Sequence, residues 1–142
     1  MGASYMSGTF EDLQAWRLGM NLVVEIYRQT QSWPKTELYG LTAQIRRASA
    51  SIPSNIAEGK GRSSDKELLK FLDYARGSVH EVQTQIMIAC RLDYLSATDA
   101  DRLGNQAAEV GRVLNGLIRA IATLRSRNNQ PVTDVSIPNA RA

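Results

Sequence analysis

Four segments of the chain repeat apolar residues at alternating steps of three and four, the spacing that lines up one face of an α-helix. The predicted stripes are Leu13, Trp16, Met20, Val23 and Tyr27; Leu38, Leu41, Ile45, Ala48 and Ile52; Leu68, Leu72, Ala75, Val79, Val82, Ile86 and Ala89; and Leu103, Ala107, Val110, Leu114, Leu117, Ile121 and Leu124. No stretch alternates apolar and polar residues long enough to predict a strand. Short connections between long amphipathic helices force neighbours to run antiparallel, so we expect an all-α, up-and-down four-helix bundle.

Polar residues with helix-capping chemistry mark three of the four predicted helix starts. Thr9 with Asp12, Ser64 with Glu67 and Thr98 with Asp101 match or approximate the capping box, in which a side-chain oxygen accepts from free backbone amides. At the other end of the first helix, Trp33 precedes Pro34 and is therefore disfavoured in the α region. The pattern predicts one domain over residues 10–127.

Pro53 interrupts the second stripe, because proline cannot donate to the carbonyl of Ser49 and crowds that turn. The helix would either end there or continue with a kink. Ile52 and Ile56 stay in phase on either side, which favours a kinked continuation.

The two ends of the chain lack this periodicity. Residues 1–9 read as a leader that precedes the fold, and residues 128–142, which hold two of the four prolines, read as a flexible tail. A single cysteine excludes an internal disulfide, and no apolar run approaches the roughly 20 residues that span a bilayer. A cytoplasmic protein with no membrane contact is expected.

Residues that would carry catalysis or bind a metal are scarce. His80 is the only histidine, which argues against a histidine-rich metal site. Cys90, ten residues further along the same helix, has no base beside it and is interpreted as a small hydrophobe. The segment 59–64 combines glycines, cations and serines, but it follows a helix and lacks the spacing of a phosphate-binding loop. We therefore expect no enzyme activity, catalytic residue, cofactor or metal.

Basic residues are grouped along the chain, although the formal net charge is only +3. Residues 110–127 contain four arginines and no acid. The candidate nucleic-acid contacts are Arg112 and Arg119 on the fourth helix, Arg46 and Arg47 on the second, and Lys60 and Arg62 at the following turn, near Lys66 and Lys70. In a monomer such groups would be ordinary solvated helix faces, whereas a symmetric oligomer would repeat each group several times.

Two helices carry apolar residues off their main stripes. Leu18, Leu22 and Ile26 form a second line on the first helix, and Phe71, Tyr74 and Ile88 lie off the stripe of the third. Exposed apolar lines usually mark partner surfaces, so these residues suggest self-association.

Several motifs, in order, resemble a known family. They are Phe10-x-x-Leu13-x-x-Trp16; Trp33-Pro34-x-x-Glu37-Leu38-Tyr39-Gly40-Leu41-x-x-Gln44-Ile45-Arg46-Arg47-Ala48; Ser51-Ile52-Pro53-Ser54-Asn55-Ile56-Ala57-Glu58-Gly59; and Phe71-Leu72-x-x-Ala75-x-Gly77-Ser78-x-x-Glu81. Together they resemble the bacterial four-helix-bundle proteins of the 23S rRNA intervening-sequence type. The resemblance covers about residues 10–127, although the fourth helix matches only as a generic amphipathic helix.

This resemblance implies an antiparallel four-helix bundle assembled into a homopentameric ring. It also implies a distant relationship to the accessory proteins of diversity-generating retroelements, which are basic pentamers that bind a reverse transcriptase and nucleic acid. No established activity follows from it. The motif positions of interest here are Arg46, Arg47, Pro53, Asn55, Glu58, Gly77, Ser78 and Glu81.

Structural roles are expected for most of these motif positions. Ser51, Asn55 and Glu58 would satisfy backbone groups freed by Pro53 or contact a neighbouring helix. Gly77 and Ser78 would allow close contact with a facing helix, and Glu81 would pair with an arginine across the bundle or a subunit interface.

Two functions are consistent with the sequence. The first is a non-enzymatic, homo-oligomeric module that binds RNA, DNA or a nucleic-acid enzyme through a basic surface. The second is a protein–protein scaffold in which the apolar lines bind the partner and the basic groups only aid solubility.

Overall fold

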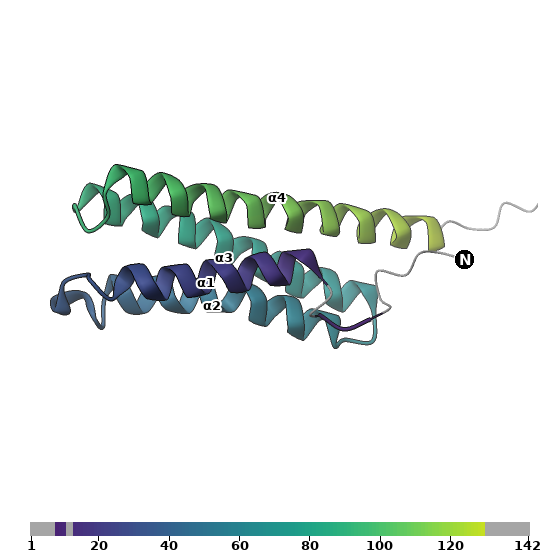
Figure 1. The fold of residues 1–142 in the computed structure, drawn as a ribbon. Coiled ribbons are helices and arrows are strands. Elements are labelled where there is room, and N and C mark those ends of the chain that lie inside the picture. Colours follow the sequence, from purple (N-terminus) through teal and green to yellow (C-terminus); the bar gives the residue numbers. More distant parts are fainter. Residues whose placement is uncertain (1–7, 11–12, 130–142) are drawn as a thin grey trace, which may run out of the picture.

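Four long helices form the fold in the computed structural model, which describes residues 8–10 and 13–129 (Figure 1). The elements are α1 (Gln14–Thr30), the short 3₁₀ helix η2 (Lys35–Glu37), α2 (Leu41–Lys60), α3 (Asp65–Arg91) and α4 (Ala97–Asn128). Helices α1 and α3 each pack against both α2 and α4. The predicted four-helix bundle is confirmed, and α4 extends one residue into the segment predicted as a tail.

The cores of α2, α3 and α4 follow the predicted stripes closely. All seven stripe residues of α3 are buried, and so are five of the seven in α4. In α2 the stripe is buried from Leu41 onward, whereas Leu38 precedes the helix and is half exposed. One apolar face of each of these three helices therefore builds the core.

The predicted core face of α1 is wrong. The buried residues of α1 are Ala15, Gly19, Leu22, Ile26 and Thr30, whereas Met20 and Tyr27 are 38% and 44% exposed. A Cβ placed on Gly19 would lie 3.3 Å from Ile52 Cγ2, so the missing side chain lets α1 approach α2 closely. The predicted stripe contained only large apolar residues, whereas the observed core face also includes Ala15, Gly19 and Thr30.

Serine hydroxyls cap two helices, one of them two residues from the predicted position. The backbone N–H of Glu67 donates to Ser64 Oγ at 3.2 Å, as predicted for α3. For α4 the N–H of Asp99 donates to Ser96 Oγ at 3.0 Å, so the predicted cap at Thr98 is wrong. The predicted cap at Thr9 is also wrong, because α1 begins after Leu13 with no side-chain cap, and Asp12 lies outside the described residues.

The connection between α1 and α2 contains a cap that the sequence analysis did not identify. Glu37 Oε2 accepts from the backbone N–H of Leu41 at 2.8 Å and so satisfies the first turn of α2. A Cβ on Gly40 would lie 3.1 Å from that oxygen, so glycine leaves room for the carboxylate. Trp33 is buried beside Tyr94, with ring centroids 5.8 Å apart. These contacts give Trp33, Glu37, Gly40 and Leu41 of the motif a structural role.

Helix α2 continues through Pro53, as predicted. Ile52 and Ile56 are both fully buried, and Asn55 Nδ2 donates to the carbonyl of Ser51 at 2.8 Å. The Ser51 and Ser78 hydroxyls hydrogen-bond at 2.6 Å, which ties α2 to α3 beside the proline. Ser51 and Ser78 thus make the expected contact between neighbouring helices, whereas Asn55 bonds a carbonyl of its own helix other than the Ser49 carbonyl that Pro53 frees.

Candidate nucleic-acid interface

The adjacent arginines of α2 point to different neighbours. Arg46 Nε donates to Thr30 Oγ1 at 2.8 Å, and its guanidinium lies 4.7 Å from the centroid of the Tyr27 ring. Arg46 therefore joins α1 to α2, and the prediction that it contacts nucleic acid loses support. Arg47 is exposed on the other side of α2, beside α3.

The cations at the α2–α3 turn are partly neutralised. Arg62 forms an ion pair with Glu58 and stacks 4.8 Å from the centroid of Phe71. Glu58 thus pairs with a cation one turn along, and its expected role at Pro53 is not supported. Lys60 is half-buried, while Lys66 and Lys70 are exposed on the first turns of α3.

The two candidate arginines of α4 differ in their surroundings. Arg112 pairs with Glu109, the residue just before the acid-free stretch, and this hydrogen bond raises the pKa of Arg112 above its ordinary value. Arg119 is exposed and makes no ion pair with any part of the chain that the structure describes. Of the two, Arg119 has the freer guanidinium for a phosphate.

The topology divides the predicted basic groups between two places. Helices α2 and α4 lie diagonally across the bundle, and α1 and α3 separate Arg47 from the arginines of α4. The α2–α3 turn and the last turns of α4 lie at the same end of the bundle (Figure 1). We call the cations there the basic end: Lys60, Arg62, Lys66, Lys70, Arg119, Arg125 and Arg127.

The basic end carries a clear excess of positive charge. Residues 58–70 and 117–129 together hold these seven basic residues and three acids, Glu58, Asp65 and Glu67. Positive charge concentrated in this way attracts phosphates through a salt-dependent interaction.

The remaining motif residues gather in a groove between α2 and α3. Gln44, Arg47, Ser51, Ser78, Glu81 and Gln85 line a hollow of about 340 Å³. Neither Arg47 nor Glu81 takes part in an ion pair within residues 8–10 and 13–129, so the predicted pairing of Glu81 is not found inside the bundle. Gly77 is exposed, and a Cβ there would meet no atom within 4 Å. Its expected contact with a facing helix is therefore wrong within one chain.

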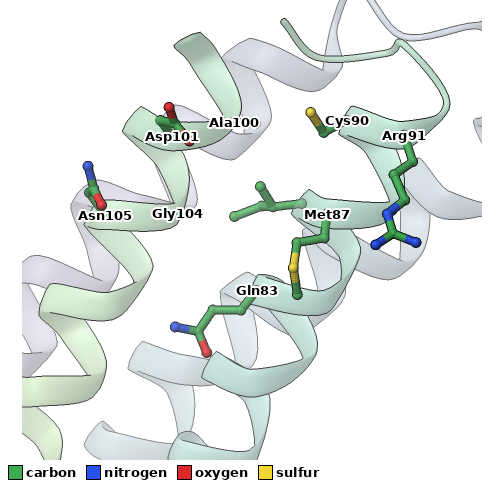
Figure 2. Close-up of a pocket in the computed structure, with 9 residues that line it drawn as sticks. Gln83, Met87, Cys90, Arg91, Ala100, Asp101, Gly104 and Asn105 are labelled. Atoms are coloured by element: carbon green, nitrogen blue, oxygen red, sulfur yellow. The ribbon is translucent and has the colours of Figure 1, made fainter. Parts of the chain in front are cut away.

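A larger hollow of about 580 Å³ lies between α3 and α4, near the turn that joins them (Figure 2). Cys90, Met87 and Gln83 line it from α3, and Asp101 and Asn105 line it from α4. No histidine lines this hollow beside Cys90. Within the described ranges, no group of three potential ligands could hold a metal ion, and no helix is long and apolar enough to cross a membrane.

Two comparisons with known proteins give matches. A family model described as 23S rRNA-intervening sequence protein matches residues 11–116. A crystal structure of a protein of unknown function from the S23 ribosomal protein family of Bacteroides thetaiotaomicron VPI-5482 superposes with a TM-score of 0.67. It is 20% identical in sequence, and the match covers 73% of this chain and 97% of the other, so it is evidence for the fold. The comparison with curated proteins gives no match.

Proposed function

Because the chain belongs to the 23S rRNA-intervening sequence protein family, we propose that it is a non-enzymatic, homo-oligomeric helical module that binds nucleic acid, or a protein that processes nucleic acid, through a basic surface. The proposed assembly is a homopentameric ring. This part of the proposal comes from the resemblance of the motifs to that family and from the family's distant relationship to the accessory proteins of diversity-generating retroelements.

The basic end is the observation that carries the nucleic-acid part of the proposal. Three helix termini that lie at the same end of the bundle carry seven cations, although these termini are far apart in the sequence. Arg46, Arg62 and Arg112 already have partners in the folded chain, so we place the interface at the basic end and centre it on Arg119. In a cyclic oligomer this cluster would recur once per subunit, which would multiply a modest charge.

A scaffold without a nucleic-acid role is the alternative, and a specific observation favours it. Met20, Val24 and Tyr27 on α1, and Tyr74 and Ile88 on α3, are each between 38% and 49% exposed. Apolar residues exposed in lines are typical of surfaces that bind other proteins.

Fluorescence anisotropy with a labelled RNA hairpin and a labelled DNA duplex tests the basic end. We expect saturable binding at about 50 mM salt that weakens at least tenfold by about 200 mM, because displaced counterions drive the association. Absence of binding at the lower salt concentration would reject the nucleic-acid proposal and favour the scaffold.

Two charge-matched variants locate the surface. Arg119→Glu should weaken binding about tenfold, a change equivalent to about 1.4 kcal/mol. Arg112→Glu changes the net charge by the same amount but removes a guanidinium that Glu109 already neutralises, so its effect should be several times smaller. Equal losses in the two variants would indicate that only net charge matters and that Arg119 is not a contact.

A further inference from the structure

The outward side of α3 carries a line of residues with no partner in the folded chain. Tyr74 and Ile88 are 49% and 42% exposed, and Gly77 and Glu81 lie between them. Their spacings of three, four and seven residues place all four on one side of the helix. We call Tyr74, Gly77, Glu81 and Ile88 the α3 face. It is apolar near both ends and has no side chain at Gly77, so another helix can approach closely there.

The groove beside the α3 face contains polar groups that the fold leaves unsatisfied. Gln85 Oε1 is shielded from solvent but accepts no hydrogen bond. Buried acceptors of this kind are rare in folded proteins. Arg47 and Glu81 line the same groove and also have no partner within the described residues. A second molecule seated on the α3 face would supply the missing donor and counter-charges.

A complementary surface lies on α1 of the same chain. Met20, Val24 and Tyr27, which we call the α1 strip, are 38%, 43% and 44% exposed. Met20 and Tyr27 belong to the predicted stripe of α1 and Val24 lies between them in the sequence, but none of the three is part of the core. Arg17 and Arg28 are exposed on the same side of α1, where Arg28 also pairs with Glu25, and the guanidinium of Arg46 lies over the Tyr27 ring. The α1 strip therefore combines apolar side chains with a basic border. This border is complementary in charge to Glu81 of the α3 face, and its N–H groups are complementary to Gln85 Oε1 in the adjacent groove.

The positions of α1 and α3 prevent these surfaces from meeting within one chain. The two helices do not contact each other, and each packs between α2 and α4. We infer that the α1 strip of one copy docks on the α3 face of the next copy, in a head-to-tail contact that uses two different surfaces of the same chain. Contacts of this type close into rings or extend into filaments. The inference rests on the proposed homo-oligomer and specifies which surfaces join its subunits.

Two variants, each disabling one of the surfaces, test the contact by light scattering coupled to size-exclusion chromatography. Gly77→Leu places a side chain in the middle of the α3 face, and the open space there lets the monomer accept it. Val24→Asp places a charge in the α1 strip. Each variant alone should elute as a monomer, whereas the wild-type chain forms an oligomer. Gly104→Leu is the matched control on α4, where a Cβ also meets nothing within 4 Å, and it should leave the oligomer intact.

Mixing the two variants distinguishes a head-to-tail contact from a symmetric one. The Val24→Asp chain retains an intact α3 face, and the Gly77→Leu chain retains an intact α1 strip, so the mixture should form a 1:1 dimer and nothing larger. If Val24→Asp alone still dimerises, the α3 face pairs with itself and the inference is wrong.

The remaining outcomes separate this inference from the proposed function. A monomeric wild-type chain would reject the proposed oligomer itself. A wild-type oligomer that survives both substitutions would reject only these two surfaces. Circular dichroism checks the folding of each variant, and Ile88→Glu repeats the α3-face test should Gly77→Leu fail to fold.

Discussion

Individual glycines have different roles in this bundle, depending on what faces them. Gly77, Gly104 and Gly116 stand within helices, yet a Cβ at each would meet no atom within 4 Å. At Gly59 a Cβ would lie 2.9 Å from Phe71 Cβ and 3.3 Å from the carbonyl oxygen of Leu68. The close approach of α2 to α3 therefore depends on Gly59, and the open glycines have no packing role inside one chain.

Gly59→Ala should destabilise the fold by about 1 kcal/mol. The added methyl group gains up to about 1 kcal/mol in helix propensity, but it meets the backbone and the stem of a side chain, and overpacking costs about 1 to 3 kcal/mol. Gly104→Ala is the control and should be neutral or stabilising. Urea denaturation at one fixed protein concentration measures both variants. A Gly59→Ala variant as stable as the wild type would show that α3 shifts easily.

Helix ends account for most of the differences between the predicted and observed elements. Ser96 and Thr98 both precede acidic residues at capping distance, and the chain uses Ser96. This choice follows from the α3–α4 turn, where Asp93 adopts a positive φ of 59° and the N–H of Tyr94 donates to the carbonyl of Ala89 at 2.9 Å. The turn therefore reverses the chain early enough for α4 to begin at Ala97.

Ser96→Ala should lower the free energy of unfolding by about 1 kcal/mol, because the first turn of α4 loses its side-chain acceptor. Thr98→Ala, two residues later, should change stability by less than about 0.5 kcal/mol, as is usual for exposed substitutions. Thermal denaturation followed by circular dichroism compares the two variants. A larger loss at Thr98 would mean that the helix starts where the sequence pattern alone places it.

The whole molecule separates its charged and apolar surfaces. The basic end lies where α2 meets α3 and α4 finishes, whereas the hollow with Cys90 lies near the α3–α4 turn at the other end. The α1 strip and the α3 face lie on different sides of the bundle between these ends. Nucleic-acid binding and self-association would therefore use adjoining parts of the surface that share no residue, with Lys70 of the basic end one turn from Tyr74 of the α3 face.

Raising the salt concentration should distinguish nucleic-acid binding from self-association. Raising salt from about 50 to about 500 mM should abolish nucleic-acid binding, because counterion release no longer favours it. The oligomer should keep its mass, because exclusion of salt from apolar surfaces maintains or strengthens burial. Sedimentation velocity and anisotropy on the same samples measure both properties. Dissociation of the oligomer in parallel with loss of binding would indicate that ion pairs hold the subunits together.

The sequence by itself determined the number of helices, the core faces of α2, α3 and α4 and the cap at Ser64, because these depend on periodicity and on contacts within one turn. It also predicted the continuation of α2 through Pro53, since the apolar residues on both sides stay in phase. The motif block supported the family, and the family model matches residues 11–116.

Only the tertiary structure decided which of the two apolar lines of α1 enters the core, because both lines satisfy the helical period. Gly19 packs against Ile52, and this contact turns the line with Leu22 and Ile26 into the core. Whether a cation is paired or free was likewise decided by its neighbours in space. Arg46, for example, donates to Thr30 and stacks on Tyr27, and both of these residues belong to α1. The sequence lists charges in chain order, whereas the antiparallel arrangement brings the α2–α3 turn and the end of α4 together as the basic end.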